Sequence, residues 1–403
     1  MRELFSVSAV RSIFFAQFIS VAGDKMFAIA LAWWVVRRED LSNPELMLGL
    51  LLATSTLPIA LSGTFVGLFI DRFNRRSCMM VADVGRLLLM AGLGLLLYYD
   101  SLTMPILFML CIPLFALEPL FDSAVSASLA SISKNPLMLA QLVALESAMP
   151  HVGYVVGAMA GWLALAVWNV EGAVWFNACT FLVSLTSVAM LPALSPPAAD
   201  PNKQEPRGRY SFLKEFPTAT RLLIIISIVN FFIAPVFLYL PLLVRDVLNG
   251  NGSQLGLLEM AFASGNLLLF GYFFLMPTEF FRSRWLMFFL AASSAGLLWM
   301  LGNTETLWTM FAILVGWGML VAFVSYLVIS SFQRTIPDEF KGRFFALLTS
   351  FCTLSFPLSF TCFGLLTSRF SLQELIFSNA ACALLVSFCF LMVPDEGSRE
   401  IVN

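Results

Sequence analysis

The stretch VRSIFFAQFISVAGDKMFAIALAWWVV, residues 10–36, decides the class of the fold. A helix needs about 20 mostly apolar residues to cross the hydrocarbon core of a bilayer, and this run exceeds that length. The run is too long for the apolar region of a secretory signal and has no small-residue cleavage site. We therefore expect it to remain in the protein as a first membrane-spanning helix, with Asp24 and Lys25 inside the span.

The composition of the whole chain points to the same class. The 403 residues are 59% hydrophobic and 12% charged, whereas a typical soluble domain is about 25% charged. The net charge of −2 argues against a nucleic-acid partner, which needs a basic face. Seven cysteines lie in apolar runs without a CxxC pair, so we expect structural thiols, no metal site and no cofactor.

Apolar runs of spanning length recur along the whole chain and predict about twelve spans. The first set covers residues 10–36, 46–70, 77–98, 104–131, 137–167 and 171–193. The second set covers residues 221–247, 254–277, 285–302, 306–332, 343–367 and 373–393. The predicted fold is an all-α integral membrane protein with twelve transmembrane helices in two six-helix bundles.

A polar, proline-rich stretch separates the two sets of spans. It predicts a bundle over residues 1–193, a cytoplasmic linker over 194–220 and a second bundle over 221–403. Lys and Arg concentrate in the segments that are cytoplasmic if both termini are inside, and positive charge marks that side. The basic residues on the opposite side are Arg37, Arg38, Arg245 and Arg369. Two bundles of six spans are typical of secondary transporters with a central substrate site.

The turn between the second and third spans reads GLFIDRFNRR, residues 67–76. This turn resembles the signature loop of the major facilitator superfamily in Gly67, Asp71, Arg72, Arg75 and Arg76. The resemblance implies a gating loop. Asp71 can meet the positive end of a neighbouring helix dipole, and the arginines can pair with acids at the cytoplasmic ends of other spans.

Further segments resemble one branch of that superfamily, the drug:proton antiporters that include macrolide efflux and enterobactin export proteins. These segments are QFISVAGD (17–24), ALAWW (30–34), DVGR (83–86) and QRTIPDEFKGR (333–343). The glycines of the fifth span, Gly153, Gly157 and Gly161, lack the Gly-Pro pair of the exporters' antiporter motif. The resemblance covers nearly the whole chain and implies transport of a small molecule, with export less firmly implied.

Charged groups at membrane depth are costly and mark functional sites. With a rise of about 1.5 Å per residue, two tiers of such groups are expected in the first half. The deeper tier, about 20–22 Å from the cytoplasmic ends, holds Asp24, Lys25, Glu118 and His151. The shallower tier, about 9–14 Å deep, holds Asp83, Arg86, Asp122 and Glu146.

The shallower tier favours a structural or gating charge network. Asp83 and Arg86 are three residues apart on one helix face, and Arg86 can also reach Asp122 or Glu146. Asp122 resembles the family's acidic partner of the signature-loop arginine. Proton handling by this tier is the alternative.

The deeper tier favours proton coupling. Asp24 and Lys25 are neighbours, so their side chains diverge by about 100° and one of them is expected to pair with Glu118. The candidate coupling residues are therefore Asp24, Lys25, Glu118 and His151, together with Glu146 of the shallower tier. A neutralised cluster that only locks helices together, and a hydrogen-bonded packing role for His151, are the alternatives.

The second half carries few charges at depth, and its polar and aromatic residues are weak candidates for a substrate cavity. They are Asn230, Tyr239, Glu259, Trp317 and Tyr326. An apolar pocket with few polar groups suits amphipathic or bulky ligands.

The sequence therefore predicts a proton-coupled exporter of an amphipathic small molecule, such as a drug or a siderophore, that works by alternating access. We expect a monomer in a bacterial inner membrane with both termini cytoplasmic, and its partners are the solute, protons and lipid. Uptake or flipping of another solute such as lysophospholipid, and a non-transporting receptor on the same scaffold, are the alternatives. An enzyme is not expected, because no catalytic constellation and no phosphate-binding loop are present.

Overall fold

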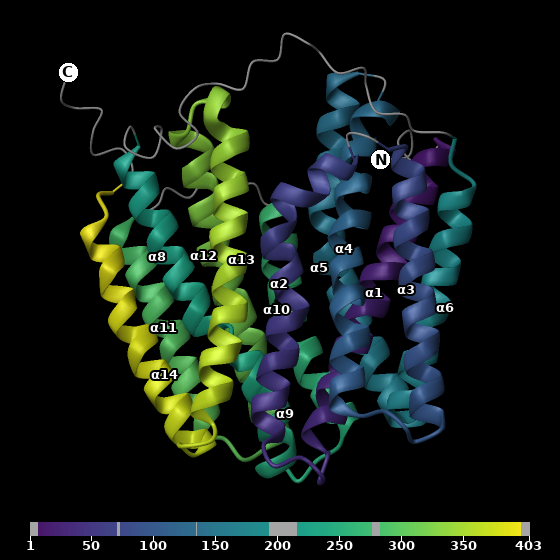
Figure 1. The fold of residues 1–403 in the computed structure, drawn as a ribbon. Helices are drawn as coiled ribbons and strands as arrows, with labels where there is room; N and C mark the ends of the chain where they lie inside the picture. Colours follow the sequence, from purple (N-terminus) through teal and green to yellow (C-terminus); the bar gives the residue numbers. More distant parts are fainter. Residues whose placement is uncertain (1–6, 71–72, 134, 193–215, 276–282, 396–403) are drawn as a thin grey trace, which may run out of the picture. The chain divides into compact units, whose positions relative to one another are not determined.

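The computed structural model describes residues 7–70, 73–133, 135–192, 216–275 and 283–395. The regular structure within these ranges is helical throughout (Figure 1). Within the same ranges, 12 helical stretches are long and apolar enough to cross a membrane. The predicted all-α membrane fold is therefore confirmed.

The helices of the first half match the expected spans closely. They are α1 (Ser8–Val36), α2 (Pro44–Ile70), α3 (Arg75–Tyr98), α4 (Met104–Ile132), α5 (Pro136–Val167) and α6 (Asn169–Ala189). The side chains of Asn74 and Asn135 cap α3 and α5 by accepting hydrogen bonds from the amides of Arg76 and Met138. Asparagine is a favoured N-cap because its carbonyl oxygen satisfies one of the free amides of the first turn.

Within its described residues, the second half contains one more α-helix than it has spans. Its helices are α8 (Pro217–Ile233), α9 (Val236–Asp246), α10 (Gly252–Leu275), α11 (Arg284–Gly302), α12 (Leu307–Thr335), α13 (Asp338–Leu366) and α14 (Leu372–Ser387). A 3₁₀ turn, η2 (Phe388–Met392), continues α14. The helices α8 and α9 together form the seventh span, over residues 217–246.

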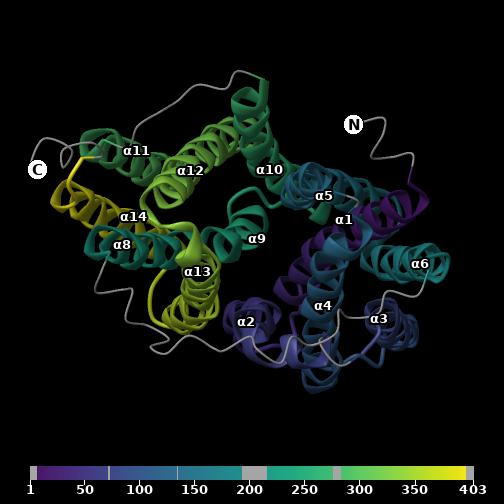
Figure 2. The ribbon, with the colours of Figure 1, turned by 90° about the horizontal axis from the view of Figure 1, so that it is seen from above.

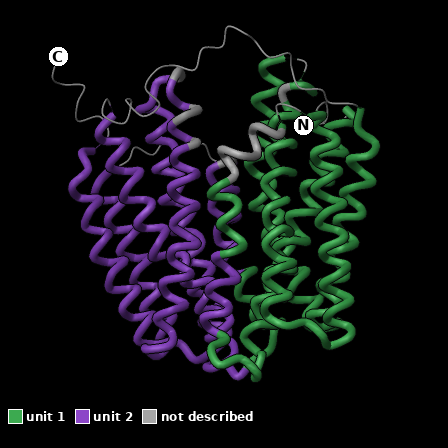
Figure 3. Tube along the Cα trace, viewed as in Figure 1, with its two compact units in different colours: residues 1–44, 54–198, 250–260 green, residues 45–53, 199–249, 261–403 purple. Residues whose placement is uncertain are grey.

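The chain divides into two compact units (Figure 3). Unit 1 comprises residues 1–44, 54–198 and 250–260, and unit 2 comprises residues 45–53, 199–249 and 261–403. The boundary between the units near residue 198 falls within the expected linker, most of which lies outside the described residues. The first turns of α2 belong to unit 2 and those of α10 belong to unit 1, whereas the rest of each helix belongs to the other unit. The predicted boundaries of the two bundles and linker stay a prediction.

In unit 1, α1 contacts α4, α5 and α6, while α3 packs against α4 and α6 (Figure 2). The approach of α5 to α1 depends on glycine. A Cβ atom on Gly157 would lie 2.8 Å from the Cβ of Lys25 and would overlap the carbonyl oxygen of Ala22. Small residues four apart let membrane helices come this close, and Gly153 and Gly161 continue the same stripe on α5.

In unit 2, the seventh span is broken at Ala234 and Pro235. Proline has no amide hydrogen, and the break leaves two carbonyl groups of α8 without helical partners. The Ser359 hydroxyl of α13 donates to the Phe231 carbonyl at 2.5 Å, and the Asn379 side chain of α14 donates to the Phe232 carbonyl at 3.1 Å. Both donors are buried. Neighbouring helices therefore supply the hydrogen bonds that the broken helix cannot make for itself.

Replacing glycine by alanine is expected to have opposite effects at two positions. Gly157→Ala should destabilise the protein by about 1–3 kcal/mol, because the added methyl group overpacks the contact of α5 with α1. The control, Gly92→Ala in α3, should stabilise it by about 0.5–1 kcal/mol, because open space surrounds Gly92 and alanine favours the helix. Thermal unfolding in detergent measures both effects. Equal shifts of Tm at the two positions would contradict the close packing of α1 on α5.

Candidate functional site

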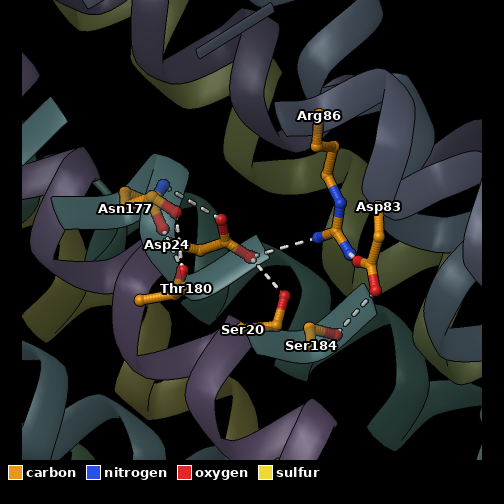
Figure 4. Close-up of polar contacts among 7 residues, drawn as sticks. All are labelled: Ser20, Asp24, Asp83, Arg86, Asn177, Thr180 and Ser184. Atoms are coloured by element: carbon orange, nitrogen blue, oxygen red, sulfur yellow. Dashed lines mark hydrogen bonds and ion pairs between the residues drawn. The ribbon is translucent and has the colours of Figure 1, made fainter. Parts of the chain in front are cut away.

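Arg86 of α3 is the centre of a buried charge cluster in unit 1 (Figure 4). Its Nη2 atom lies 2.9 Å from Oδ1 of Asp83, and its Nη1 atom lies 3.3 Å from Oδ2 of Asp24 on α1. The Arg86 side chain is 2% exposed and that of Asp83 is 0% exposed, whereas that of Asp24 is 27% exposed. The guanidinium thus joins α1 to α3, and only one of its two carboxylate partners is accessible.

Two phenylalanine rings enclose the same guanidinium. The Arg86 Cζ atom lies 5.0 Å from the ring centroid of Phe121 on α4 and 4.5 Å from that of Phe181 on α6. A guanidinium over an aromatic face gains an attraction that strengthens when water is excluded. One side chain therefore contacts groups on α1, α4 and α6 as well as its own helix.

Hydroxyl and amide groups donate further hydrogen bonds to the carboxylates of Asp83 and Asp24. Ser184 of α6 donates to Oδ2 of Asp83 at 2.7 Å. Asp24 accepts longer hydrogen bonds, 3.4 Å from the Ser20 hydroxyl and 3.5 Å from the Asn177 amide. Hydrogen bonds near 2.7 Å are strong and those near 3.5 Å are weak. Asp83 is therefore held firmly, and Asp24 is held loosely.

Further acids of unit 1 lie within electrostatic reach of Arg86 and Asp24. Glu118 on α4 interacts with Asp24, Asp122 and Arg86. Asp122, one turn further along α4, interacts with Arg86, Asp24 and Glu146. Both α4 carboxylates are half-buried, and Glu146 on α5 accepts a hydrogen bond from the Ser126 hydroxyl. Carboxylates outnumber the Arg86 guanidinium in this cluster, so Arg86 cannot neutralise them all.

Lys25, the neighbour of Asp24 on α1, has a different partner. Its Nζ atom lies 2.6 Å from Oε2 of Glu259 in the first turns of α10, which belong to unit 1. The two side chains are 18% and 8% exposed, so the pair is largely removed from solvent. Adjacent residues of α1 therefore reach two different helices, as expected for side chains about 100° apart on a helix.

These contacts correct the sequence-based assignment of partners. Neither ion pair described for Asp24 and Lys25 includes Glu118, which the sequence had suggested as a partner for one of them. The two predicted tiers are also in contact, because the long side chain of Arg86 reaches Asp24 from the predicted shallower level.

A sequence model of the Major Facilitator Superfamily matches residues 13–360 of the chain. The chain belongs to this superfamily. It is a transporter of the facilitator fold, with relatives among efflux pumps. Macrolide efflux protein A of Streptococcus pyogenes is 21% identical over 397 residues, which are 95% of this chain and 95% of that protein. Multidrug efflux pump Tap of Mycobacterium tuberculosis (strain CDC 1551 / Oshkosh) is 25% identical over 269 residues, 63% of this chain and 62% of that protein.

Solved structures share the fold of the transporter. The crystal structure of a D-xylose-proton symporter superimposes with a TM-score of 0.72 at 15% sequence identity, covering 95% of this chain and 97% of that one. At this identity the likeness concerns the fold alone. The family and the fold are those of membrane transporters, and the described residues of this chain contain 12 helical stretches of spanning length.

The signature loop of the transporter is described only in part. Asp71 and Arg72 lie outside the described residues, and Gly67 lies in the last turn of α2. Arg75 donates to the Ala127 carbonyl and to the Ser131 hydroxyl, each at 2.6 Å, near the end of α4.

Arg76 donates to the carbonyl of Ala189, the last residue of α6, at 2.6 Å. The described contacts of the two arginines are thus with carbonyl and hydroxyl oxygens in the C-terminal turns of α4 and α6, where the helix dipole is negative, rather than with the expected acids. The gating role of the loop stays a prediction.

The candidate cavity residues of the second half do not form one group. Asn230 and Trp317 line a pocket in unit 2, whereas Tyr239 is fully buried and Tyr326 stacks on Phe273 with ring centroids 4.2 Å apart. Glu259 instead pairs with Lys25 in unit 1. His151 is half-buried in α5. Among the described residues no group of His, Cys, Asp and Glu has the arrangement of a metal site.

Sequence reasoning missed the neutral polar partners of the cluster. Ser20 lies one turn before Asp24, a spacing that could have indicated their hydrogen bond. Asn177 and Ser184 of α6 carry no such local signal, because their partners lie on α1 and α3. The Thr180 hydroxyl lies 2.7 Å from the backbone carbonyl of Asn177 and 2.9 Å from its Oδ1, so its one hydrogen is shared between these two acceptors.

Removal of the central guanidinium is expected to be more damaging than removal of a carboxylate. Arg86→Gln should cost about 3–5 kcal/mol, because it leaves Asp83 and Asp24 uncompensated. Adding Asp83→Asn to Arg86→Gln should recover part of the loss, since one uncompensated charge is removed. Thermal unfolding in detergent gives the comparison, with Arg369→Gln at an exposed position as the control. Losses that simply add in the double variant would contradict direct coupling of the two residues.

A second cycle tests the pair of Lys25 and Glu259. Lys25→Met alone should destabilise unit 1 by about 3 kcal/mol, because a mostly buried carboxylate loses its cation. Combining Lys25→Met with Glu259→Met should bring Tm back near the parent value, since apolar residues often replace a buried ion pair without loss. A double variant no more stable than Lys25→Met would show that the carboxylate is not the source of the loss.

Proposed function

We propose that this transporter exports an amphipathic small molecule in exchange for protons and that Asp24 is the carboxylate that binds the proton. The observation that carries the proposal is the difference in exposure and in hydrogen-bond length between the two carboxylates that contact Arg86. Asp83 is fully buried and held at 2.7–2.9 Å, whereas Asp24 is 27% exposed and held at 3.3–3.5 Å. A proton carrier must be accessible and must exchange its partners, and Asp24 meets both requirements better than Asp83.

Proton binding at Asp24 would change the charge balance of the cluster. A neutral Asp24 no longer attracts Arg86 strongly, and the guanidinium keeps Asp83 as its anionic partner. The link between α1 and α3 is thereby weakened without loss of the anchor on α3. Because Lys25 is the next residue of α1, a movement of this turn also acts on its ion pair with Glu259.

Glu118 and Asp122 are the supporting acids in this proposal. Both are half-buried and interact with Asp24, so a proton can reside on any member of the group while the others stay ionised. Glu146 is the next acid along this group and lies on α5. Alternating access, with the bundles of residues 1–193 and 221–403 moving against each other, would then link proton binding to solute release.

The direction of transport and the class of solute are inferred from the relatives. Macrolide efflux protein A and multidrug efflux pump Tap are named as exporters, and the former aligns with 95% of this chain. The distribution of Lys and Arg supports an orientation with both termini in the cytoplasm. The bacterial relatives support a bacterial inner membrane location. Uptake or flipping of another solute is the alternative, and the direction of flux under a defined proton gradient separates the two.

The first test is proton–solute exchange in everted membrane vesicles over a panel of macrolides, cationic dyes and siderophores. Solute-dependent proton release is expected with the parent protein and should be lost in Asp24→Asn with solute binding retained. Asp40→Asn, at an exposed carboxylate beyond α1 whose pKa is lowered by its bond to Arg38, should behave as the parent.

Asp83→Asn provides the contrast on the other side of Arg86. It is expected to lower thermal stability and to leave the ratio of protons to solute unchanged in the protein that remains folded. Full proton release in Asp24→Asn would contradict the assignment and would move coupling to Glu118 or Glu146.

A further inference from the structure

Unit 2 contains a pocket that the charge cluster of unit 1 does not involve. Residues of α8, α11, α12 and α14 line it, and its cavity volume is about 50 Å³. About 10–15 Å³ of such volume holds one water, so the pocket has room for a small group or for the end of a larger molecule.

The lining of the pocket is apolar with a few hydrogen-bonding groups. Most of it is aliphatic, with Val229 and Ile233 from α8 and Leu298 from α11 as examples. Among the described residues that line it, none is ionisable. Because a buried charge needs a charged or strongly polar partner, the part of an occupant that enters the pocket is uncharged.

The polar groups of the pocket have hydrogen-bonding capacity to spare. Trp317 donates its indole N–H to the Ser294 oxygen at 2.6 Å. Neither the Ser294 hydroxyl hydrogen nor the Ser325 hydroxyl has a partner within the ranges that the structure describes. Other serines of unit 2 donate back to their own helix, as Ser355 does to the Phe351 carbonyl at 3.0 Å.

These unused hydroxyls define the chemistry of the occupant. An O–H group in an apolar surrounding gains most from an oxygen acceptor such as a carbonyl, ether or hydroxyl. The carboxamide of Asn230, which also bonds Cys352, has further hydrogen-bonding capacity at the same pocket. A neutral molecule with one oxygen function on a larger apolar body fits this combination.

The break in the seventh span lies beside the pocket. Phe232 and Ile233, the last residues of α8, line it, and the break follows at Ala234. Substrate sites of transporters are typically built at discontinuous helices. The location of the break is thus a second, independent indication of a binding site.

We infer that the pocket among α8, α11, α12 and α14 binds a neutral, largely apolar molecule through an oxygen acceptor that meets Ser294 and Ser325. This binding does not depend on the direction or coupling of transport. Two sources can supply such a molecule, a neutral lipid of the bilayer or the uncharged part of the transported solute, and the experiment below separates them.

The test uses photoreactive probes on the purified full chain in lipid nanodiscs. Three diazirine probes share one twelve-carbon chain and end in an alcohol, a carboxylate or an ammonium group. After irradiation, peptide mass spectrometry locates the labels. The alcohol is expected to label residues 226–233, 291–298, 317–325 and 383–386 at least fivefold more than the two charged probes. Equal labelling of these segments by the three probes would overturn the inference.

Matched variants on one helix test occupancy of the pocket. Ala383 of α14 lines the pocket, whereas Ala381 of the same helix is exposed and does not. Ala383→Phe should abolish labelling of the pocket segments by the alcohol, and Ala381→Phe should retain it. Unchanged labelling in a folded Ala383→Phe protein would also overturn the inference.

A smaller change keeps the test decisive if the phenylalanine variant does not fold. Ser325→Ala should weaken competition by the unlabelled alcohol about five- to tenfold, as expected for one lost hydrogen bond. Ser330→Ala, on the same helix, serves as the control because that hydroxyl donates to the Leu327 carbonyl. Identical competition in the two serine variants would contradict the assigned hydrogen bond.

The source of the occupant is read from competition and extraction. A neutral lipid that copurifies with the parent protein and is depleted in Ala383→Phe assigns the site to the bilayer. Competition by an exported solute, with no such lipid present, assigns it to the cargo. Because labelling is measured without a proton gradient, its failure is distinct from failure of proton-coupled export.

Discussion

The structure of unit 1 depends on a single buried guanidinium. Arg86 is almost completely removed from solvent, and it is stabilised by a firm bond to Asp83, a looser one to Asp24 and two aromatic faces. Each of these partners lies on a different helix except Asp83, so the charge of Arg86 sets how α1, α4 and α6 approach α3. An uncompensated arginine in this position would be costly. The first bundle is therefore organised around one charge as much as around its apolar contacts.

The sequence predicted the spans well and the partners less well. Run length and hydropathy suffice for the helices, because a membrane demands about 20 apolar residues whatever packs beside them. The partners of Asp24 and Lys25 depend on helix rotation and on the reach of long side chains. The depth of a residue in its predicted span does not specify either of these. Glu118 was therefore the expected partner, whereas Arg86 and Glu259 are the observed ones. Pro235 lay within a long apolar run, so the break in the seventh span was read as continuous helix.

The two units handle polar groups in different ways. In unit 1 the buried polar groups of the described residues include the charged side chains of Arg75, Asp83, Arg86 and Glu259 beside neutral ones, and the proposed proton site lies among them. In the described part of unit 2 the buried polar groups are hydroxyls, amides and carbonyls, as at the break where Ser359 and Asn379 meet α8. This division suits a protein that couples a charged co-substrate to a largely apolar cargo. Among the described residues, fully buried charged side chains lie in the unit proposed to bind protons, and the proposed pocket for a neutral molecule is lined without them.

The adjacent positions of Asp24 and Lys25 have a consequence for how the family can diverge. Their partners lie on separate helices, so both ion pairs depend on the rotational phase of α1 as well as on its composition. Substitutions at exposed positions of α1 leave that phase intact. Insertion or deletion of one residue before Asp24 turns both side chains by about 100° and shifts them by about 1.5 Å, which breaks both pairs in one event. The first span is thus free to drift in sequence while its length up to this turn stays constrained.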